Sequence, residues 1–200
     1  MKERSKSCLV HGTIDVNSWF IAPPKVDEAR PSKCPHCGTA GRPSGDPLGM
    51  VGHGTRSRQI RGPTRPGESP AILVIRARRY RCRGCDRTTT VVPRGVVPRR
   101  HYGAPAIALA CFLLGVSGLT VAAVRQRVAP GITHEPGWAV VRRWLAAVRA
   151  RLLFPFVRPW PVDFDLPRRT ERVATTVMAF APGSYANDEE RLFAGIALAA

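Results

Sequence analysis

Short runs of alternating or β-branched residues in the first half of the chain predict a small β-sheet. The runs are residues 53–61, 71–81 and 88–92. Gly62-Pro63 follows the first run and Pro93 follows the third, and both are residues at which strands commonly stop. We therefore expect three antiparallel strands separated by loops rich in glycine and proline. A further short strand is expected over residues 14–21, ahead of Pro23-Pro24.

A run without charged residues, from 104 to 124, raises the question of a membrane span, because it is long enough to cross a bilayer. A Gly-Val-Ser-Gly turn interrupts this run, and its alanines dilute its hydrophobicity. We therefore expect two short helices, residues 106–114 and 120–128, and no membrane association. Thr120 is expected to be the N-cap of the second helix.

A third helix is predicted to open at Pro136, a residue favoured in the first helical turn, and to run to Leu153. Its apolar residues are spaced so that one face is buried. They occupy positions 138, 141, 144, 145, 148 and 152, whereas Arg142, Arg143, Arg149 and Arg151 lie off that face. Two more helices are expected over residues 169–180 and 188–199, and the apolar end of the last one could pack on the body or on a partner chain.

Two cysteine pairs carry the clearest chemical signal, Cys34-Pro-His-Cys37 and Cys82-Arg-Gly-Cys85. The two-residue gap lets both thiolates of a pair reach one metal ion from a tight turn. Two such pairs supply the four soft ligands of one structural Zn²⁺ site. Gly38 and Asp86 follow the pairs where the backbone usually needs a positive φ. His36 is expected to face solvent rather than to replace a thiolate.

The charge of the chain is strongly positive and unevenly placed. The formal net charge is +17 for 200 residues, and residues 34–102 carry +11 of it. A localised surplus of this kind attracts phosphate backbones. Codon bias in a GC-rich genome explains why arginine outnumbers lysine, but it does not explain why acids are scarce in this segment. Six cysteines without a signal-peptide pattern favour a reducing, cytoplasmic compartment.

Together these patterns predict an α+β fold, in which a small antiparallel zinc ribbon precedes an all-α helix-turn-helix domain. The expected order is an N-terminal segment of unknown role (1–33), a four-cysteine zinc ribbon (34–93), a Pro/Arg linker (94–103), a helix-turn-helix domain (104–153) and a Pro-rich segment with C-terminal helices (154–200). Because such a ribbon buries little apolar surface, its metal would supply much of its folding free energy.

This order of zinc ribbon, Arg-rich linker and helix-turn-helix resembles the N-terminal heads of bacterial insertion-sequence transposases. The resemblance covers about residues 34–152. It is carried by Cys34-Pro-His-Cys37-Gly38, the basic strand that begins at His53-Gly54, the strand that ends in Tyr80-Arg-Cys82, and Val141-Arg-Arg-Trp144-Leu145. It implies binding to the terminal repeats of a mobile element, on the nucleoid of a bacterial cell.

In that family a separate RNase-H-like domain cuts and joins DNA with three carboxylates on two metal ions. The segment after residue 153 is too short to hold such a domain, and Asp163-x-Asp165 alone is a weak signal. No other catalytic motif is present. We therefore expect a stand-alone, transposon-associated head or a truncated transposase, and no enzymatic activity.

The leading hypothesis is a zinc-dependent protein that binds double-stranded DNA at element ends or operators. Arginines of the ribbon and the linker would contact phosphates, and those of the third helix would read bases. The candidate DNA-binding residues are Arg56, Arg58, Arg76, Arg78, Arg79, Arg81, Arg99, Arg100, Arg142 and Arg143. The alternatives are an adaptor that recruits a separately encoded transposase or integrase, an RNA-binding zinc ribbon, and a redox or metallochaperone protein. The sequence leaves the oligomeric state open.

Overall fold

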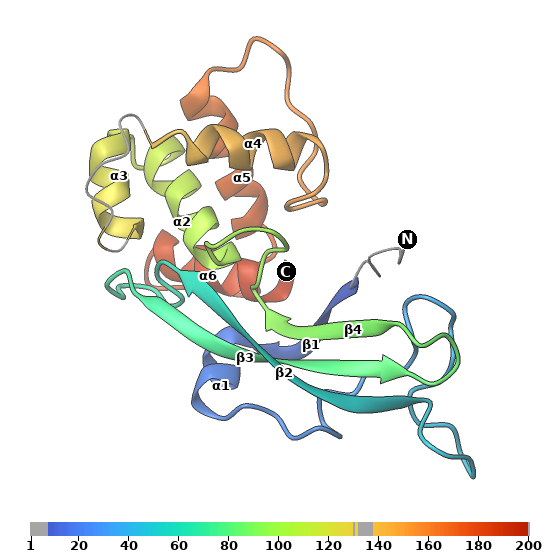
Figure 1. Ribbon diagram of the computed structural model, residues 1–200. Helices are drawn as coiled ribbons and strands as arrows, with labels where there is room; N and C mark the ends of the chain where they lie inside the picture. Colours follow the sequence, from blue (N-terminus) through green and yellow to red (C-terminus); the bar gives the residue numbers. More distant parts are fainter. Residues whose placement is uncertain (1–7, 130, 132–137, 200) are drawn as a thin grey trace. The chain divides into compact units, whose positions relative to one another are not determined.

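A computed structural model of the chain describes residues 8–129, 131 and 138–199 (Figure 1). These residues form two compact units. The sheet unit comprises the described residues up to Gln59 together with Leu73–Pro98. The helical unit comprises Ile60–Ile72 and the described residues from Arg99 onward. The fold is therefore mixed α and β, as the sequence predicts.

The sheet has four strands in the order β1-β4-β3-β2. They are β1 (Cys8–Asp15), β2 (Met50–Arg61), β3 (Ile72–Cys82) and β4 (Thr88–Arg94). β4 pairs antiparallel with β3, and β2 runs opposite to β3 (Figure 1). The three strands predicted from the sequence are thus confirmed. β1 adds a fourth, parallel to β4, which the sequence analysis did not anticipate.

β4 continues through Pro93 instead of ending before it. The register between β1 and β4 shifts between His11 and Asp15, beside this proline. Proline lacks the N–H that a regular ladder needs, and an irregularity in the pairing is where a strand tolerates it.

The strand predicted over residues 14–21 is wrong, because that segment forms helix α1 (Val16–Ile21). Asp15 is its N-cap, and the Asp15 carboxylate accepts hydrogen bonds from the backbone N–H groups of Asn17 and Ser18, at 2.9 and 3.1 Å. This cap satisfies N–H groups that have no partner within the helix and so favours a helical start. Trp19 is buried, and its indole N–H donates to the carbonyl oxygen of Arg76 at 3.1 Å, which fixes α1 on β3.

The helical unit is built around α2, whose residues from Ala104 to Leu114 are all buried. The α-helices among its described residues are α2 (Ala104–Gly115), α3 (Val121–Val128), α4 (Val140–Arg149), α5 (Leu166–Met178) and α6 (Asp188–Ala199). α5 and α6 pack on α2 and on each other. The first part of the uncharged run is therefore a core helix that ends at Gly115, and its last residues begin α3. Among the described residues, no helix is long and apolar enough to cross a membrane.

Two glycines allow these helices to approach closely. A Cβ atom on Gly115 would lie 2.1 Å from the backbone nitrogen of Glu171 in α5. A Cβ atom on Gly195 of α6 would lie 2.1 Å from the carbonyl oxygen of Val177. Backbone-to-backbone contact of this kind leaves no room for any side chain at either position.

The helix predicted over residues 188–199 is confirmed with the same bounds as α6, and α5 starts three residues before the predicted 169–180. Thr120 is the N-cap of α3, and its hydroxyl accepts a hydrogen bond from the N–H of Ala123 at 3.3 Å, as predicted. α4 ends at Arg149, earlier than predicted, so Leu152 is 76% exposed while Leu153 is buried. The predicted start of this helix at Pro136 lies outside the described residues.

Candidate metal centre and basic surface

The four paired cysteines meet at one point in the sheet unit. Their Sγ atoms all lie within 4.8 Å of one another. The Sγ atoms of Cys34 and Cys85 are 3.8 Å apart, and those of Cys37 and Cys82 are 3.6 Å apart. Four sulfurs on a tetrahedron around zinc, each at the usual Zn–S distance of about 2.3 Å, would be separated by about 3.8 Å. The spacing and the chemistry of the donors therefore fit one structural Zn²⁺.

The first cysteine turn has the backbone geometry of a metal knuckle. The N–H of Cys34 donates to the carbonyl oxygen of Thr39 at 2.8 Å, and the N–H of Gly38 donates to the carbonyl oxygen of Cys34 at 2.9 Å. Gly38 has φ +75°, in the left-handed region where glycine is favoured. This turn holds Cys34 and Cys37 on the same side of the loop.

The second cysteine turn repeats the same pattern. The N–H of Cys82 donates to the carbonyl oxygen of Arg87 at 3.0 Å, and the N–H of Asp86 donates to the carbonyl oxygen of Cys82 at 2.9 Å. Asp86 has φ +59°, the counterpart of Gly38. Asp is one of the few non-glycine residues that tolerate this conformation. The requirement for a positive φ at both positions, predicted from the sequence, is confirmed.

The two knuckles are held together by contacts outside the sulfurs. The N–H of Arg83 donates to the carbonyl oxygen of Gly49 at 2.8 Å, which ties the second knuckle to the segment leading into β2. A Cβ atom on Gly84 would lie 2.5 Å from the Thr39 hydroxyl oxygen, so the second knuckle packs directly on the first. β3 ends at Cys82 and β4 starts at Thr88, so the sheet carries the second knuckle between two of its strands.

The thiols influence one another's ionisation. The Thr39 hydroxyl, 3.1 Å from the Cys37 sulfur, is the main cause that lowers the pKa of Cys37 to about 6. A backbone hydrogen bond from Arg87 would lower the pKa of Cys85. Partial burial and the neighbouring thiols of the cluster outweigh it and raise that pKa to about 12. Without a cation, four thiols this close cannot all be ionised, because their negative charges repel one another. A divalent cation would hold all four as thiolates.

The remaining cysteines take no part in this cluster. Cys111 is buried in α2, and burial raises the pKa of its thiol to about 12, so it packs as a small apolar residue. Cys8 and His11 are three residues apart on β1 and therefore lie on opposite faces of the strand. Among the described residues, the four paired cysteines form the one group suited to a metal ion. His36 is half-buried instead of solvent-facing, and its Nε2 atom is buried without a hydrogen-bond partner in the described part of the chain.

The candidate DNA-binding arginines of the sheet are divided between its two faces. Arg76 and Arg78 share one face of β3, and Arg79 and Arg81 share the other, because side chains alternate along a strand. The guanidinium of Arg78 donates to the carbonyl oxygen of Pro24 at 2.9 Å, so this side chain holds the segment after α1.

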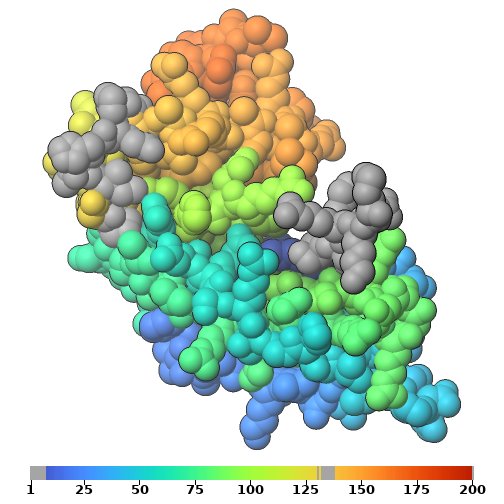
Figure 2. All heavy atoms as spheres, viewed as in Figure 1, coloured from blue at the N-terminus to red at the C-terminus, as the bar shows by residue number. Residues whose placement is uncertain are grey.

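Two other sheet arginines also have internal partners. Arg58 donates to the carbonyl oxygen of Val97 at 2.6 Å and is half-buried. Arg81 forms an ion pair with the exposed Asp86. Arg79 lies opposite Thr90 of β4 on the face away from Arg78. Arg56 is exposed on β2, the strand at the edge of the sheet, whose residues 52–57 are all exposed and can be followed in Figure 2.

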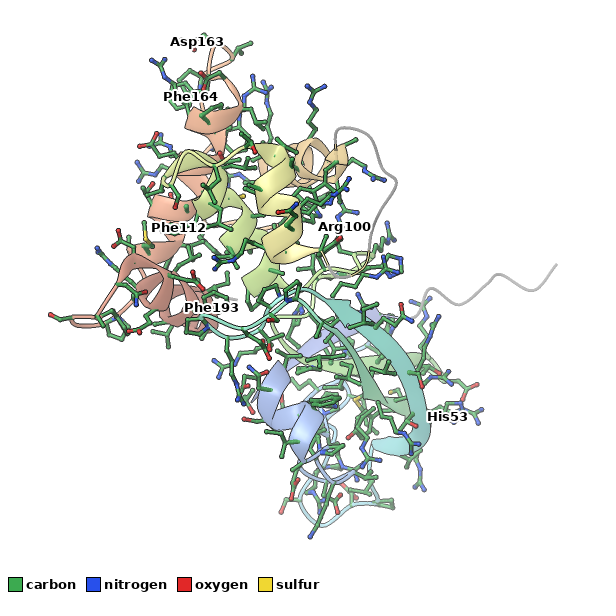
Figure 3. All side chains as sticks on the ribbon, turned by 90° about the vertical axis from the view of Figure 1, so that its left-hand side faces the viewer. His53, Arg100, Phe112, Asp163, Phe164 and Phe193 are labelled. Atoms are coloured by element: carbon green, nitrogen blue, oxygen red, sulfur yellow. The ribbon has the colours of Figure 1, made fainter. Side chains whose placement is uncertain are left out.

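The other candidate arginines belong to the helical unit. Arg142 and Arg143 are exposed on α4, as predicted, and the opposite face of this helix is buried. Arg99 is exposed, whereas Arg100 is half-buried (Figure 3). The ten predicted residues therefore lie on two units, and those on β3 are divided between its two faces.

Aromatic rings anchor the buried face of α4. Trp144 lies edge-on to Tyr102 and to Trp138, with ring centroids 5.1 and 5.4 Å apart. All three rings are buried, so the two tryptophans are core residues and are not available to stack on bases. Their packing leaves the arginine face of α4 exposed.

Two exposed arginines beside the second knuckle were missed in the sequence analysis. Arg83 lies between Cys82 and Cys85, and Arg87 follows Asp86. The signal was present in the motif Cys-Arg-Gly-Cys-Asp-Arg. Because these two residues lie in a turn, the alternation that marks a strand does not single them out.

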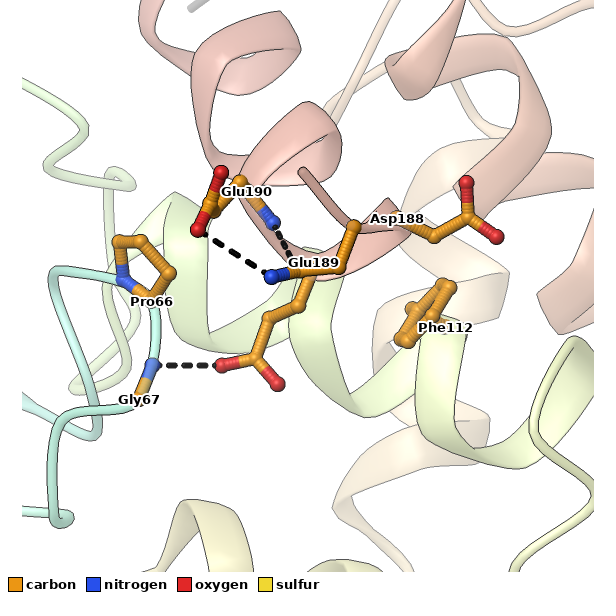
Figure 4. Close-up of a pocket in the computed structure, with 7 residues that line it drawn as sticks. Pro66, Gly67, Phe112, Asp188, Glu189 and Glu190 are labelled. Atoms are coloured by element: carbon orange, nitrogen blue, oxygen red, sulfur yellow. Dashed lines mark hydrogen bonds between the residues drawn. The ribbon is translucent and has the colours of Figure 1, made fainter. Parts of the chain in front are cut away.

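The helical unit contains an open hollow lined by Pro66, Gly67, Phe112 and residues 187–190 (Figure 4). The N–H of Gly67 donates to one carboxylate oxygen of Glu189 at 2.7 Å, and the other oxygen pairs with Arg127 at 3.3 Å. Glu189 of α6 therefore links this helix to the loop at Gly67 and to α3. Asp165 is the N-cap of α5, and its carboxylate accepts a hydrogen bond from the N–H of Arg168 at 2.9 Å, whereas the exposed Asp163 precedes it in the loop (Figure 3).

Residues 34–122 match the model of a family described as a domain of unknown function, DUF6431. The match spans both knuckles, strands β2 to β4 and helix α2, and it ends within α3. No curated protein and no solved structure matches the chain. The matched segment thus contains the whole candidate metal centre.

Proposed function

We propose that this chain is a zinc-dependent DNA-binding protein that acts with a mobile element and recognises element-end or operator DNA. The observation that carries the proposal is the fit of the four cysteine sulfurs to one tetrahedral ion on a small, basic sheet. Residues 34–102 hold the cluster and carry a net charge of +11. A rigid, positively charged surface of this kind suits a phosphate backbone.

Cys34, Cys37, Cys82 and Cys85 would hold the zinc, which would act as a structural cross-link between two loops far apart in the sequence. Because the ion would join two loops of the sheet unit, it would contribute a substantial part of the folding free energy of this unit. DNA binding by the sheet would then depend on zinc.

The second contact would come from α4. Its exposed face carries Arg142, Arg143 and Arg149 around Ala146, and its other face is fixed by buried aromatic rings. An exposed helix with arginines on a rigid support has the form that enters a major groove. In this proposal Arg142 and Arg143 read bases, while Arg79 of the sheet contacts phosphate. The link to a mobile element rests on the resemblance to transposase heads, and the proposal includes no catalytic step.

The adaptor hypothesis receives less support from the helical unit. The apolar side chains of α6 that suggested a partner surface include Leu192, Phe193 and Ile196, and all three are buried. α6 packs on α2 and α5, so deleting it would disrupt this unit instead of removing a docking surface. Leu198 is the one large apolar side chain of α6 that is strongly exposed.

A competition experiment tests the nucleic-acid class. The purified full-length chain would be bound to a labelled DNA duplex and challenged with unlabelled duplex DNA, structured RNA and an acidic protein. The proposal predicts that duplex DNA competes best. More effective competition by structured RNA would favour the RNA-binding alternative, and the absence of any duplex binding would reject the proposal.

A further inference from the structure

The two knuckles share one backbone geometry but differ in charge. In the first, the positions after the leading cysteine and after the positive-φ residue are Pro35 and Thr39. In the second, the same positions are Arg83 and Arg87. The shared hydrogen bonds make this comparison direct, because equivalent positions occupy equivalent places in the two turns.

The turn brings Arg83 and Arg87 to the same short loop. Arg83 directly follows Cys82 in the chain, and the carbonyl oxygen of Arg87 accepts a hydrogen bond from the N–H of Cys82 at 3.0 Å. The backbone of Arg83 is fixed in turn by its own hydrogen bond to Gly49. Both side chains are exposed. The loop therefore carries two exposed, positively charged arginine side chains on a backbone that hydrogen bonds hold in place.

The acid in this loop does not neutralise these two side chains. Asp86 pairs with Arg81, at 2.5 Å between Oδ1 and Nε. Within the part of the chain that the structure describes, neither Arg83 nor Arg87 forms an ion pair. The neighbouring first knuckle adds Lys33 and no acid between residues 29 and 45. The surface around the second knuckle thus has a local surplus of positive charge.

We propose that Arg83 and Arg87 form a phosphate clamp on the second knuckle that grips the backbone of duplex DNA. The inference rests on the proposed function and adds the place where the sheet unit contacts the nucleic acid. It also explains how the metal would matter for binding. Zinc holds the loop that carries both arginines, so its removal would release the clamp. Guanidinium groups suit this role because their planar donors match phosphate oxygens.

The test measures the salt dependence of binding to one DNA duplex for the zinc-loaded full-length protein. The double variant Arg83→Ala/Arg87→Ala is compared with the wild type and with Arg42→Ala. Arg42 is an exposed arginine of the same unit that pairs with Asp27, so its removal controls for a change in net charge alone. Each lost phosphate contact lowers the slope of log K against log salt by about 0.9.

For the double variant we expect the slope to fall by about 2. Its affinity deficit relative to the wild type should then shrink about tenfold between 50 and 200 mM salt. Arg42→Ala should leave the slope nearly unchanged. The charge-conserving Arg83→Lys/Arg87→Lys variant should keep most of the slope, and zinc content should equal that of the wild type in every variant.

The outcomes separate the clamp from the proposed function. If the wild type binds duplex DNA and the double alanine variant behaves like Arg42→Ala, the clamp is overturned and the proposed function stands. If the double lysine variant loses as much slope as the double alanine variant, a disturbed fold explains the loss and the clamp is likewise overturned. If the wild type binds no duplex DNA, both fall.

Discussion

The Sγ atom of Cys37 lies 3.6 Å from that of Cys82, although the two residues are 45 positions apart in the chain. Between them the chain forms β2 and β3, and the sheet returns to within bonding reach of a shared metal ion. A contact that closes so long a loop is costly in chain entropy, so a metal ion at this point would stabilise the sheet strongly. The cysteine cluster is therefore the point at which a metal ion would stabilise the sheet unit most.

Replacing one cysteine of the cluster should remove the metal. We expect Cys82→Ser to lower the zinc content from one ion per chain to nearly none and to unfold the sheet unit, because three thiolates hold zinc far less tightly than four. Cys8→Ser is the matched control, since Cys8 lies outside the cluster. Metal analysis and the circular dichroism spectrum would check both. A Cys82→Ser protein with full zinc content would show that the assignment of ligands is wrong.

Zinc uptake should depend on pH in a defined direction. In the metal-free protein the pKa of Cys37 is about 6 and that of Cys85 is about 12, so at pH 7 Cys37 is already ionised and Cys85 still carries its proton. Binding at pH 7 must then release the Cys85 proton, and zinc affinity should rise from pH 6 to pH 8. Calorimetry in buffers of different ionisation enthalpy would measure the protons released. An affinity independent of pH would contradict this prediction.

The two units should respond to different substitutions. Gly115→Ala would place a methyl group 2.1 Å from the backbone of Glu171, and we expect it to destabilise the helical unit by about 1–3 kcal/mol or more. The neighbouring Val116→Ala, at a residue that is 40% exposed, should have little effect. Thermal unfolding would report stability, and zinc content should stay at the wild-type level in both. Equal stability of the two variants would refute the close packing of α2 and α5.

Base readout and phosphate contact should be separable by mutation. Arg142→Ala should cost about 1–3 kcal/mol on a selected site and relax sequence preference, whereas Arg79→Ala should weaken binding evenly across sequences. Binding titrations on the selected site and on random duplex would measure both effects. Equal losses on the two DNAs for both variants would rule out this division of roles.

Local signals in the sequence were sufficient to predict the cysteine cluster and most elements. The two-residue gap between the cysteines, with Gly38 and Asp86 after them, gave the knuckles without any knowledge of the fold. The hydroxyl of Thr120 marked the start of α3 because a cap acts within one turn. These features depend on neighbours in the chain, and for that reason the sequence reveals them.

Features that depend on distant partners were missed. β1 pairs with β4, which lies some 80 residues later in the chain, and nothing in the sequence of β1 indicates which strand it pairs with. The apolar residues after Asp15 are typical of a strand, but the Asp15 carboxylate caps a helix start there. Arg58 and Arg78 looked like DNA ligands, but carbonyl groups of Val97 and Pro24 engage them in the folded chain. The sequence alone cannot distinguish an arginine that donates to a carbonyl group within the fold from one that is available to bind DNA.

If the proposed function is correct, one zinc ion builds the surface that binds DNA. The most direct measurement is the zinc content of the purified full-length protein, together with duplex binding before chelation, after chelation and after zinc is restored, at two salt concentrations. We expect one zinc per chain and salt-sensitive binding that is lost on chelation and regained with zinc. A protein without zinc, or one whose DNA binding is unchanged by chelation, would contradict this expectation.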